Sequence, residues 1–271
     1  MAWALLLGTA AWGGLHLLGL PLYVSTTVAM CAPAIAAGLV ARRGGSYVDT
    51  LTTARLMLNL EMRANWWSAV GVVVTVLLGT IGFGLTLGIG RGGAPQVARF
   101  AASLGSVILL FPVLILPALM EEVGWRGYLL ARLSRLGPAR AAALTGLAWG
   151  IWHAPAIALV GFDYPAHRIL GIFAIIIFTV PFGMVLAWLR RRSGSLLAPA
   201  LAHAALNAMM PALAIALPHS DTLLASPMGL LGAAPFAAFS GLLLVQGAFA
   251  RPPMRVAATL DLPAGSMPVA S

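Results

Sequence analysis

The chain has 271 residues, of which 61% are hydrophobic and only 8% charged, and its formal net charge is +9. Soluble proteins carry about 25% charged residues, so this composition excludes a soluble domain and predicts an all-α, polytopic integral membrane protein. All of the basic residues are arginine. In a membrane protein such charge reports orientation, and we expect no nucleic-acid partner.

Eight apolar stretches follow one another, each near the length of about 20 residues that a transmembrane helix needs. They are Trp3–Leu20, Leu22–Ala41, Trp66–Ile89, Phe100–Met120, Arg140–Val160, Ile169–Leu189, Leu196–Leu217 and Met228–Ala250. We therefore predict about eight transmembrane helices in a single domain over residues 1–251, with a catalytic core at about 103–217. The fourth helix is expected to run on to about Leu133.

Two segments lie outside these stretches. Residues 252–271 form a Pro/Ala tail that we expect to be disordered and cytoplasmic. Gly44–Asn65 holds Arg55, Glu61 and Arg63 among leucines, which indicates an amphipathic helix lying on the membrane surface. A plain connector and a lid are both open roles for it.

The arginines predict the orientation. Threading eight spans puts thirteen of the sixteen on one side, and only Arg91, Arg99 and Arg168 on the other. Arginine concentrates in cytoplasmic loops, so both termini are expected in the cytoplasm of a cell, which we take to be bacterial. The protein is then a multi-pass protein of the inner membrane.

Glu121 and Glu122 follow the apolar run of the fourth span and form the only Glu-Glu pair in the chain. Ionisable groups inside a membrane are costly and usually mark a working site. Glu122 and Arg126 are four residues apart on one helix face, which predicts an ion pair. Glu121 points roughly 100° away around the helix. A solvated helix end is the simpler alternative for the pair alone.

Two further spans carry polar side chains at a similar depth. At 1.5 Å per residue, Glu121 lies roughly 21 Å, His153 roughly 20 Å and His203 roughly 17 Å from the arginines that end their helices. His203 and Asn207 are four residues apart and share a face. Together these residues predict one buried polar chamber, which we expect to face the arginine-rich, cytoplasmic side.

Two chemistries suit such a chamber. A carboxylate and a neutral imidazole can deprotonate water, while a second imidazole and an amide N–H stabilise an oxyanion. Alternatively, Glu121, His153 and His203 could bind Zn²⁺ and leave a fourth position for water. The residues leave the choice between a metal and a metal-independent mechanism open. The single Cys31 excludes an internal disulfide.

These residues resemble the CAAX prenyl protease and bacteriocin-processing family, also called the Abi or type II CAAX protease family. Its pattern of Glu-Glu-x-x-x-Arg, Phe-x-x-x-His and His-x-x-x-Asn corresponds here to Glu121-Glu122…Arg126, Trp149…His153 and His203…Asn207. One departure is Trp149, where the family has Phe. The resemblance covers about Val107 to Pro211.

The resemblance implies an intramembrane endopeptidase, described in the family either as a metalloprotease or as a metal-independent glutamate enzyme. Glu121 and His153 would activate water, His203 and Asn207 would stabilise the oxyanion, and Glu122 and Arg126 would assist. The substrate would be a peptide or membrane protein in the lipid bilayer. Its identity and the oligomeric state are open.

Two other functions use the same residues. A transporter could use the chamber as a proton path, although no inverted repeat is visible. A non-catalytic bacteriocin-immunity or scaffold protein could retain the fold without the activity.

Overall fold

Long apolar stretches form helices because the bilayer offers no hydrogen-bond partner to a backbone outside its own helix. The computed structural model describes residues 1–43, 66–91, 94–218, 220–225 and 227–250, and within these ranges every regular element is a helix. Six helices there are long and apolar enough to cross a membrane. The structure confirms the predicted all-α, polytopic class.

The first and eighth predicted spans are shorter than expected. Ala2–Leu17 and Leu230–Val245 are apolar helices of only 10–17 residues. The predicted amphipathic helix at Gly44–Asn65 and the predicted disordered tail at 252–271 lie outside the described residues.

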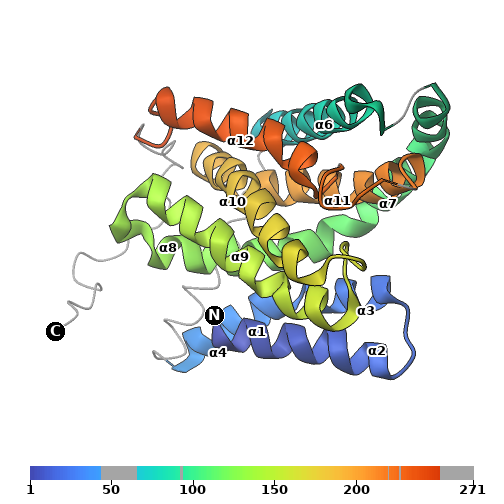
Figure 1. Cartoon of the computed structure of the whole chain (residues 1–271). Coiled ribbons are helices and arrows are strands. Elements are labelled where there is room, and N and C mark those ends of the chain that lie inside the picture. The colour runs from blue at the N-terminus through green and yellow to red at the C-terminus, as the bar shows by residue number, and fades with distance from the viewer. Residues whose placement is uncertain (44–65, 92–93, 219, 226, 251–271) are drawn as a thin grey trace.

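The N-terminal part forms a hairpin of two helices beside the remainder (Figure 1). One arm contains α1 (Ala2–Thr9), a π-helical segment (Ala10–Gly14) and α2 (Leu15–Leu17), and the other contains α3 (Leu22–Ala29) and α4 (Ala32–Arg43). The indole of Trp152 donates a hydrogen bond of 3.0 Å to the carbonyl oxygen of Ala4, and thereby ties this hairpin to the central bundle.

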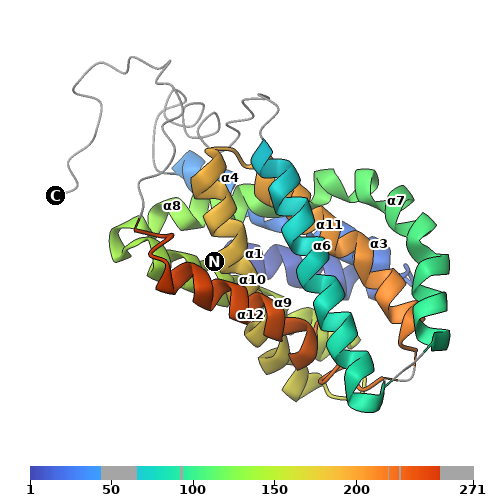
Figure 2. The same cartoon turned by 90° about the horizontal axis from the view of Figure 1, so that it is seen from above.

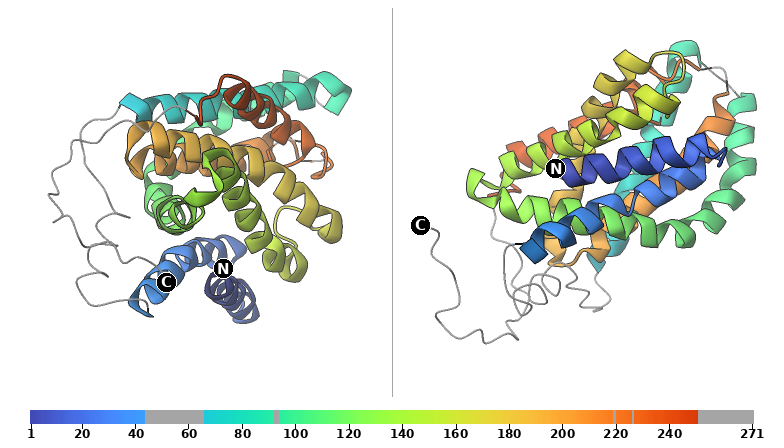
Figure 3. Two further views of the ribbon diagram at one scale, coloured as in Figure 1. Left: turned by 90° about the vertical axis from the view of Figure 1, so that its left-hand side faces the viewer. Right: turned by 90° about the horizontal axis from the view of Figure 1, so that it is seen from below.

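The central bundle contains the five remaining long helices and one shorter helix. They are α6 (Trp66–Thr86, continued by a π-helical segment, Leu87–Arg91), α7 (Ala94–Glu122), α9 (Pro138–Val160), α10 (Arg168–Ser193), α11 (Leu197–Ala216) and the shorter α12 (Leu230–Val245). Helix α9 packs along α10, α11 packs against α7 and α6, and α12 covers α10 and α6 (Figure 2). The N-terminal hairpin lies on the α7 and α9 side (Figure 3).

Helix α7 does not end at the glutamates. A π-helical segment (Val123–Leu129), α8 (Leu130–Arg132) and a 3₁₀ turn (Ser134–Leu136) continue it, as the sequence predicts. A single apolar helix thus spans Pro95–Arg132. π-Bulges are frequent at functional sites. This one buries Gly124 against Pro33 of α4 so closely that any side chain would overlap the proline ring.

Two glycines let α9 and α10 approach each other. A Cβ atom on Gly146 would lie 2.7 Å from the carbonyl oxygen of Thr179, and one on Gly183 would lie 2.9 Å from the Cα atom of Gly146. The Cβ atom on Gly183 would also lie 3.0 Å from Nη2 of Arg126. Small residues at this crossing therefore make room for a buried guanidinium.

Candidate active site

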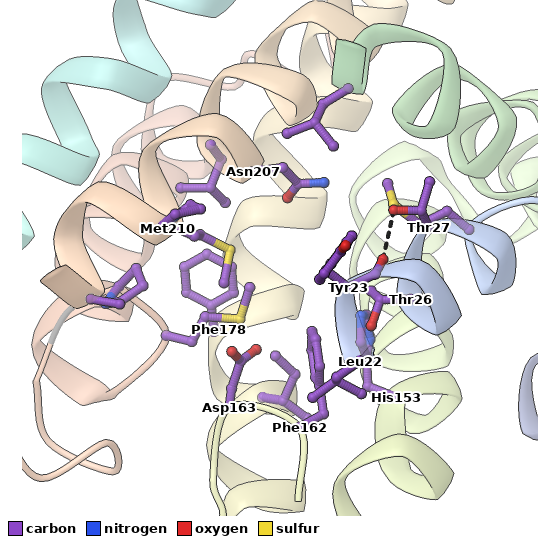
Figure 4. Close-up of a pocket in the computed structure, with 18 of the residues that line it drawn as sticks. Leu22, Tyr23, Thr26, Thr27, His153, Phe162, Asp163, Phe178, Asn207 and Met210 are labelled. Carbon is purple, nitrogen blue, oxygen red and sulfur yellow. Dashed lines mark hydrogen bonds between the residues drawn. The ribbon is translucent and has the colours of Figure 1, made fainter. Parts of the chain in front are cut away.

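The predicted residues meet around one cavity of about 1030 Å³. Glu121, His153, His203 and Asn207 line it, from three different helices. The remaining lining is largely apolar and comes from the N-terminal hairpin, from α7, α9, α10 and α11, and from loops at the helix ends (Figure 4). The expected buried chamber exists, and its polar groups form a small part of an otherwise hydrophobic wall.

Glu122 and Arg126 lie behind the cavity wall, where both side chains are fully buried. Nη1 of Arg126 donates to Oε1 of Glu122 at 2.9 Å, which confirms the predicted ion pair. The guanidinium also lies over the ring of Trp149, 4.7 Å from its centroid. A buried charge is costly unless it is paired. The ion pair and the contact with Trp149 therefore stabilise the buried guanidinium of Arg126.

The same carboxylate oxygen binds His203. Nδ1 of His203 lies 2.9 Å from Oε1 of Glu122. A carboxylate can only accept, so Nδ1 of the ring carries the proton and donates it. Nε2 is then the nitrogen left for the cavity. Glu122 therefore fixes the orientation of His203 as well as that of Arg126.

Glu121 is held by two indoles. Its Oε2 atom accepts hydrogen bonds from Nε1 of Trp149 at 2.7 Å and from Nε1 of Trp125 at 3.2 Å. Its other oxygen, Oε1, has no hydrogen-bond partner among the residues that the structure describes. One oxygen of the Glu121 carboxylate is thus fixed by two indoles, while the other remains available at the cavity.

His153 is enclosed by aromatic rings. Nδ1 lies 2.9 Å from the carbonyl oxygen of Trp149. Because that oxygen can only accept, Nδ1 is protonated and Nε2 of the neutral ring has a lone pair. Trp152 packs edge-on, with ring centroids 4.9 Å apart, and Phe162 stacks at 6.0 Å. The imidazole of His153 therefore has a fixed orientation and aromatic neighbours.

Asn207 lies on the same wall as His203, one helical turn further along α11, and its amide group points into the cavity (Figure 4). Its side chain makes no hydrogen bond within the described residues. The amide N–H is available to a ligand.

The cavity does not extend toward the arginine-rich side, contrary to expectation. The α7 residues that line the cavity are Glu121 and residues that precede it in the chain. The α11 residues that line it are His203 and residues that follow it. The arginines at 132–140 and 190–192 lie at the opposite helix ends. Buried side chains of the π-helical segment, Trp125 and Arg126 among them, fill the space on the arginine side.

Three further residues at this site were not predicted from the sequence. Trp12, from the N-terminal hairpin, is fully buried, lines the cavity and packs on Trp152 with ring centroids 4.6 Å apart. Phe162 and Asp163, from the loop after α9, also line it. No sequence spacing predicts that Trp12 lies near His153. Asp163 could have been identified as a candidate, because an acidic residue shortly after an apolar span is unusual in this chain.

The residues do not fit a zinc ion in this arrangement. Among the described residues, no three His, Cys, Asp or Glu side chains are grouped as a metal site requires. We therefore derive no catalytic step through a metal.

The segment that holds all six predicted site residues also matches a known family. Residues 103–209 match the model of the family described as type II CAAX prenyl endopeptidase Rce1-like. The chain carries an Rce1-like core. The family resemblance inferred from the three motifs is thereby confirmed. No curated protein matches the chain. The Rce1-like core runs from within α7 to within α11, and leaves out the N-terminal hairpin that supplies Trp12.

Proposed function

We propose that this protein is an intramembrane endopeptidase in which Glu121 and His153 activate water for attack on a peptide bond. The observation that carries the proposal is that Glu121, His153, His203 and Asn207 line one cavity, while Glu122, Trp125 and the backbone of Trp149 orient them from behind. The Rce1-like core supports the reaction class.

The first step is the attack of water on the substrate carbonyl carbon. Oε1 of Glu121 or Nε2 of His153 accepts a proton from the water as its oxygen bonds to that carbon. Both atoms face the cavity and have no partner among the described residues. The aromatic surround excludes competing water and strengthens electrostatic interactions within it.

The second step is stabilisation of the oxyanion. The amide of Asn207 donates one hydrogen bond. His203 donates from Nε2 when its ring carries both protons, and Glu122 provides the counter-charge 2.9 Å from Nδ1. The tetrahedral intermediate then collapses as the C–N bond breaks. The proton taken from water passes to the leaving amine, which yields one new carboxylate and one new amine.

The lining of the cavity favours an apolar peptide segment as substrate, in the lipid bilayer. We further propose that the protein is a multi-pass protein of the cell membrane with its arginine-rich helix ends in the cytoplasm. The cavity then lies in the non-cytoplasmic half of the membrane, and substrates reach it from there.

The test is cleavage of a peptide library by the purified protein in nanodiscs. Glu121→Gln and His153→Ala should each lower kcat by about 10²–10⁴-fold, the usual contribution of a general base. His16→Ala is the matched control, because His16 is exposed and does not line the cavity. Unchanged cleavage in both site variants would refute the proposal.

A further inference from the structure

Asp163 is an acidic residue in an otherwise apolar part of the cavity wall. It belongs to the loop between α9 and α10, and its carboxylate points into the cavity in the same region as Phe162 and Phe178 (Figure 4). The residue lies outside the three family motifs, and the proposed reaction makes no use of it.

The loop that carries Asp163 is held rigidly. Gly161, with φ +71°, ends α9, and a left-handed conformation of this kind is natural for glycine. The hydroxyl of Tyr164 donates to the carbonyl oxygen of Met228 at 2.8 Å. Arg168 donates to the carbonyl oxygens of Ala158 and Leu159 at 3.0 and 3.2 Å. These contacts hold the backbone that carries Asp163 in place before any ligand binds.

Asp163 itself adopts φ +56° and is the one non-glycine residue with positive φ in the described part of the chain. Aspartate and asparagine tolerate this conformation better than other side chains do. An Asp163→Asn variant can therefore keep the backbone as it is while removing the charge.

Among the residues that the structure describes, the carboxylate of Asp163 has no ion-pair partner. Its Oδ2 atom is inaccessible and has no hydrogen-bond partner in the described residues. The two nearest basic residues in sequence are engaged elsewhere, since His167 faces Asp221 at 3.9 Å and Arg168 binds backbone carbonyls. Burying an unpaired carboxylate is costly, and in a membrane protein such a group usually serves function.

We propose that Asp163 forms a subsite for a cationic group of the substrate, a Lys or Arg side chain within an otherwise apolar peptide. This inference rests on the proposed function. A carboxylate in a low-dielectric wall binds ammonium or guanidinium groups strongly and selectively, while the surrounding apolar wall accepts the neighbouring residues.

The subsite lies close to the reaction centre. Asp163 directly follows Phe162, whose ring stacks on that of His153 with centroids 6.0 Å apart. An extended peptide advances about 3.3 Å per residue. The cationic residue therefore occupies a position within a few residues of the bond that is cleaved.

The experiment measures binding rather than cleavage. N-acetylated, C-amidated apolar peptides carry a single Lys or a single Gln at successive positions, and their affinity for the Glu121→Gln protein in nanodiscs is read by fluorescence anisotropy. At one position Lys should bind about tenfold more tightly than Gln, near the lower end of the range for hydrogen bonds to charged groups. Asp163→Asn should abolish this ratio.

Asp221→Asn is the matched control, since Asp221 lies in the neighbouring loop and does not line the cavity. It should keep the Lys preference, and Asp163→Glu should retain part of it. Equal affinity for Lys and Gln at every position, or a preference that persists in Asp163→Asn, would overturn the inference. Equal affinity for Lys and Gln would be measured without any Asp163 variant, so this result would overturn the inference even if Asp163→Asn misfolds.

Failure of the subsite and failure of the proposed function are distinguishable. A Lys preference without cleavage by the unaltered protein would retain the subsite and reject the protease. Cleavage of apolar peptides without any Lys preference would retain the protease and reject the subsite.

Discussion

Nε1 of Trp149 donates a hydrogen bond of 2.7 Å to Oε2 of Glu121, and so joins α9 to α7 at the proposed reaction centre. In the family pattern this position is Phe, which has no donor. In the sequence, Trp149 is visible only as a departure from the family pattern, whereas in the structure its indole positions the carboxylate of Glu121.

Trp149→Phe should therefore lower kcat by roughly 10–100-fold, because it removes a hydrogen bond to a charged group that contributes about 1.5–3 kcal/mol. KM should change little, whereas the melting temperature should fall, since phenylalanine leaves part of the buried space of the indole empty. Steady-state kinetics on a cleaved peptide measure this. Trp66→Phe is the control, because Trp66 is exposed and remote from the cavity. Full activity in Trp149→Phe would show that the indole N–H positions nothing.

Loss of the Glu122 carboxylate should destabilise the protein strongly. Glu122→Gln leaves Arg126 buried without its counter-charge, and breaking a buried pair in this way costs about 3–5 kcal/mol. The combined variant Glu122→Gln/Arg126→Met removes both charges and should be less destabilised than Glu122→Gln alone. Reversible unfolding in mixed micelles measures the difference. Additive losses would contradict direct coupling of the two side chains.

Gly183→Ala should also destabilise the fold, by about 1–3 kcal/mol, as overpacking usually does. The added methyl group would lie 2.9 Å from the Cα atom of Gly146 and 3.0 Å from Nη2 of Arg126. Gly84→Ala is the comparison, because nothing lies within 4 Å of the added atom. That variant should be neutral or slightly stabilised, since alanine favours helix. Equal effects of the two variants would argue against a tight crossing.

Asp163 should make stability depend on pH. Burial raises the pKa of Asp163 from its ordinary value of 3.8 to about 7. The folded protein therefore retains this proton while the unfolded chain loses it. The stabilising contribution is fully present below pH 3.8 and is lost as the pH rises through 7.

The melting temperature relative to Asp163→Asn should thus fall as the pH rises from about 4 to 7 and level off above that. Both the unaltered protein and Asp163→Asn retain the nearby His167–Asp221 pair. The difference between their melting temperatures therefore reports the titration of Asp163 alone. Parallel curves over this range would contradict an elevated pKa.

The orientation can be tested with fusions. Green fluorescent protein after the C-terminus should fluoresce, because that end is expected in the cytoplasm, where the fusion folds. Alkaline phosphatase inserted after Ser220 should be active, because the cavity side is expected outside the cytoplasm. The reverse pattern would place the cavity on the cytoplasmic side and contradict the arginine rule for this protein.

Local and periodic features were determined by the sequence alone. Hydrophobic length predicts the helices, and spacing of four residues predicts the Glu122–Arg126 pair, because both depend only on helix geometry. The depths of Glu121, His153 and His203 likewise follow from counting residues. The helix-length estimate failed at both ends of the bundle, where the first and last apolar stretches form shorter helices.

The tertiary structure alone decided which atoms meet. Helical periodicity does not reveal that Oε1 of Glu122 serves both Arg126 and His203, nor that two indoles hold Oε2 of Glu121. It also gives no sign that Trp12 reaches His153 or that the cavity extends away from the arginine-rich side. These relationships depend on how helices far apart in the chain pack together, and packing is set by the fit of many side chains at once.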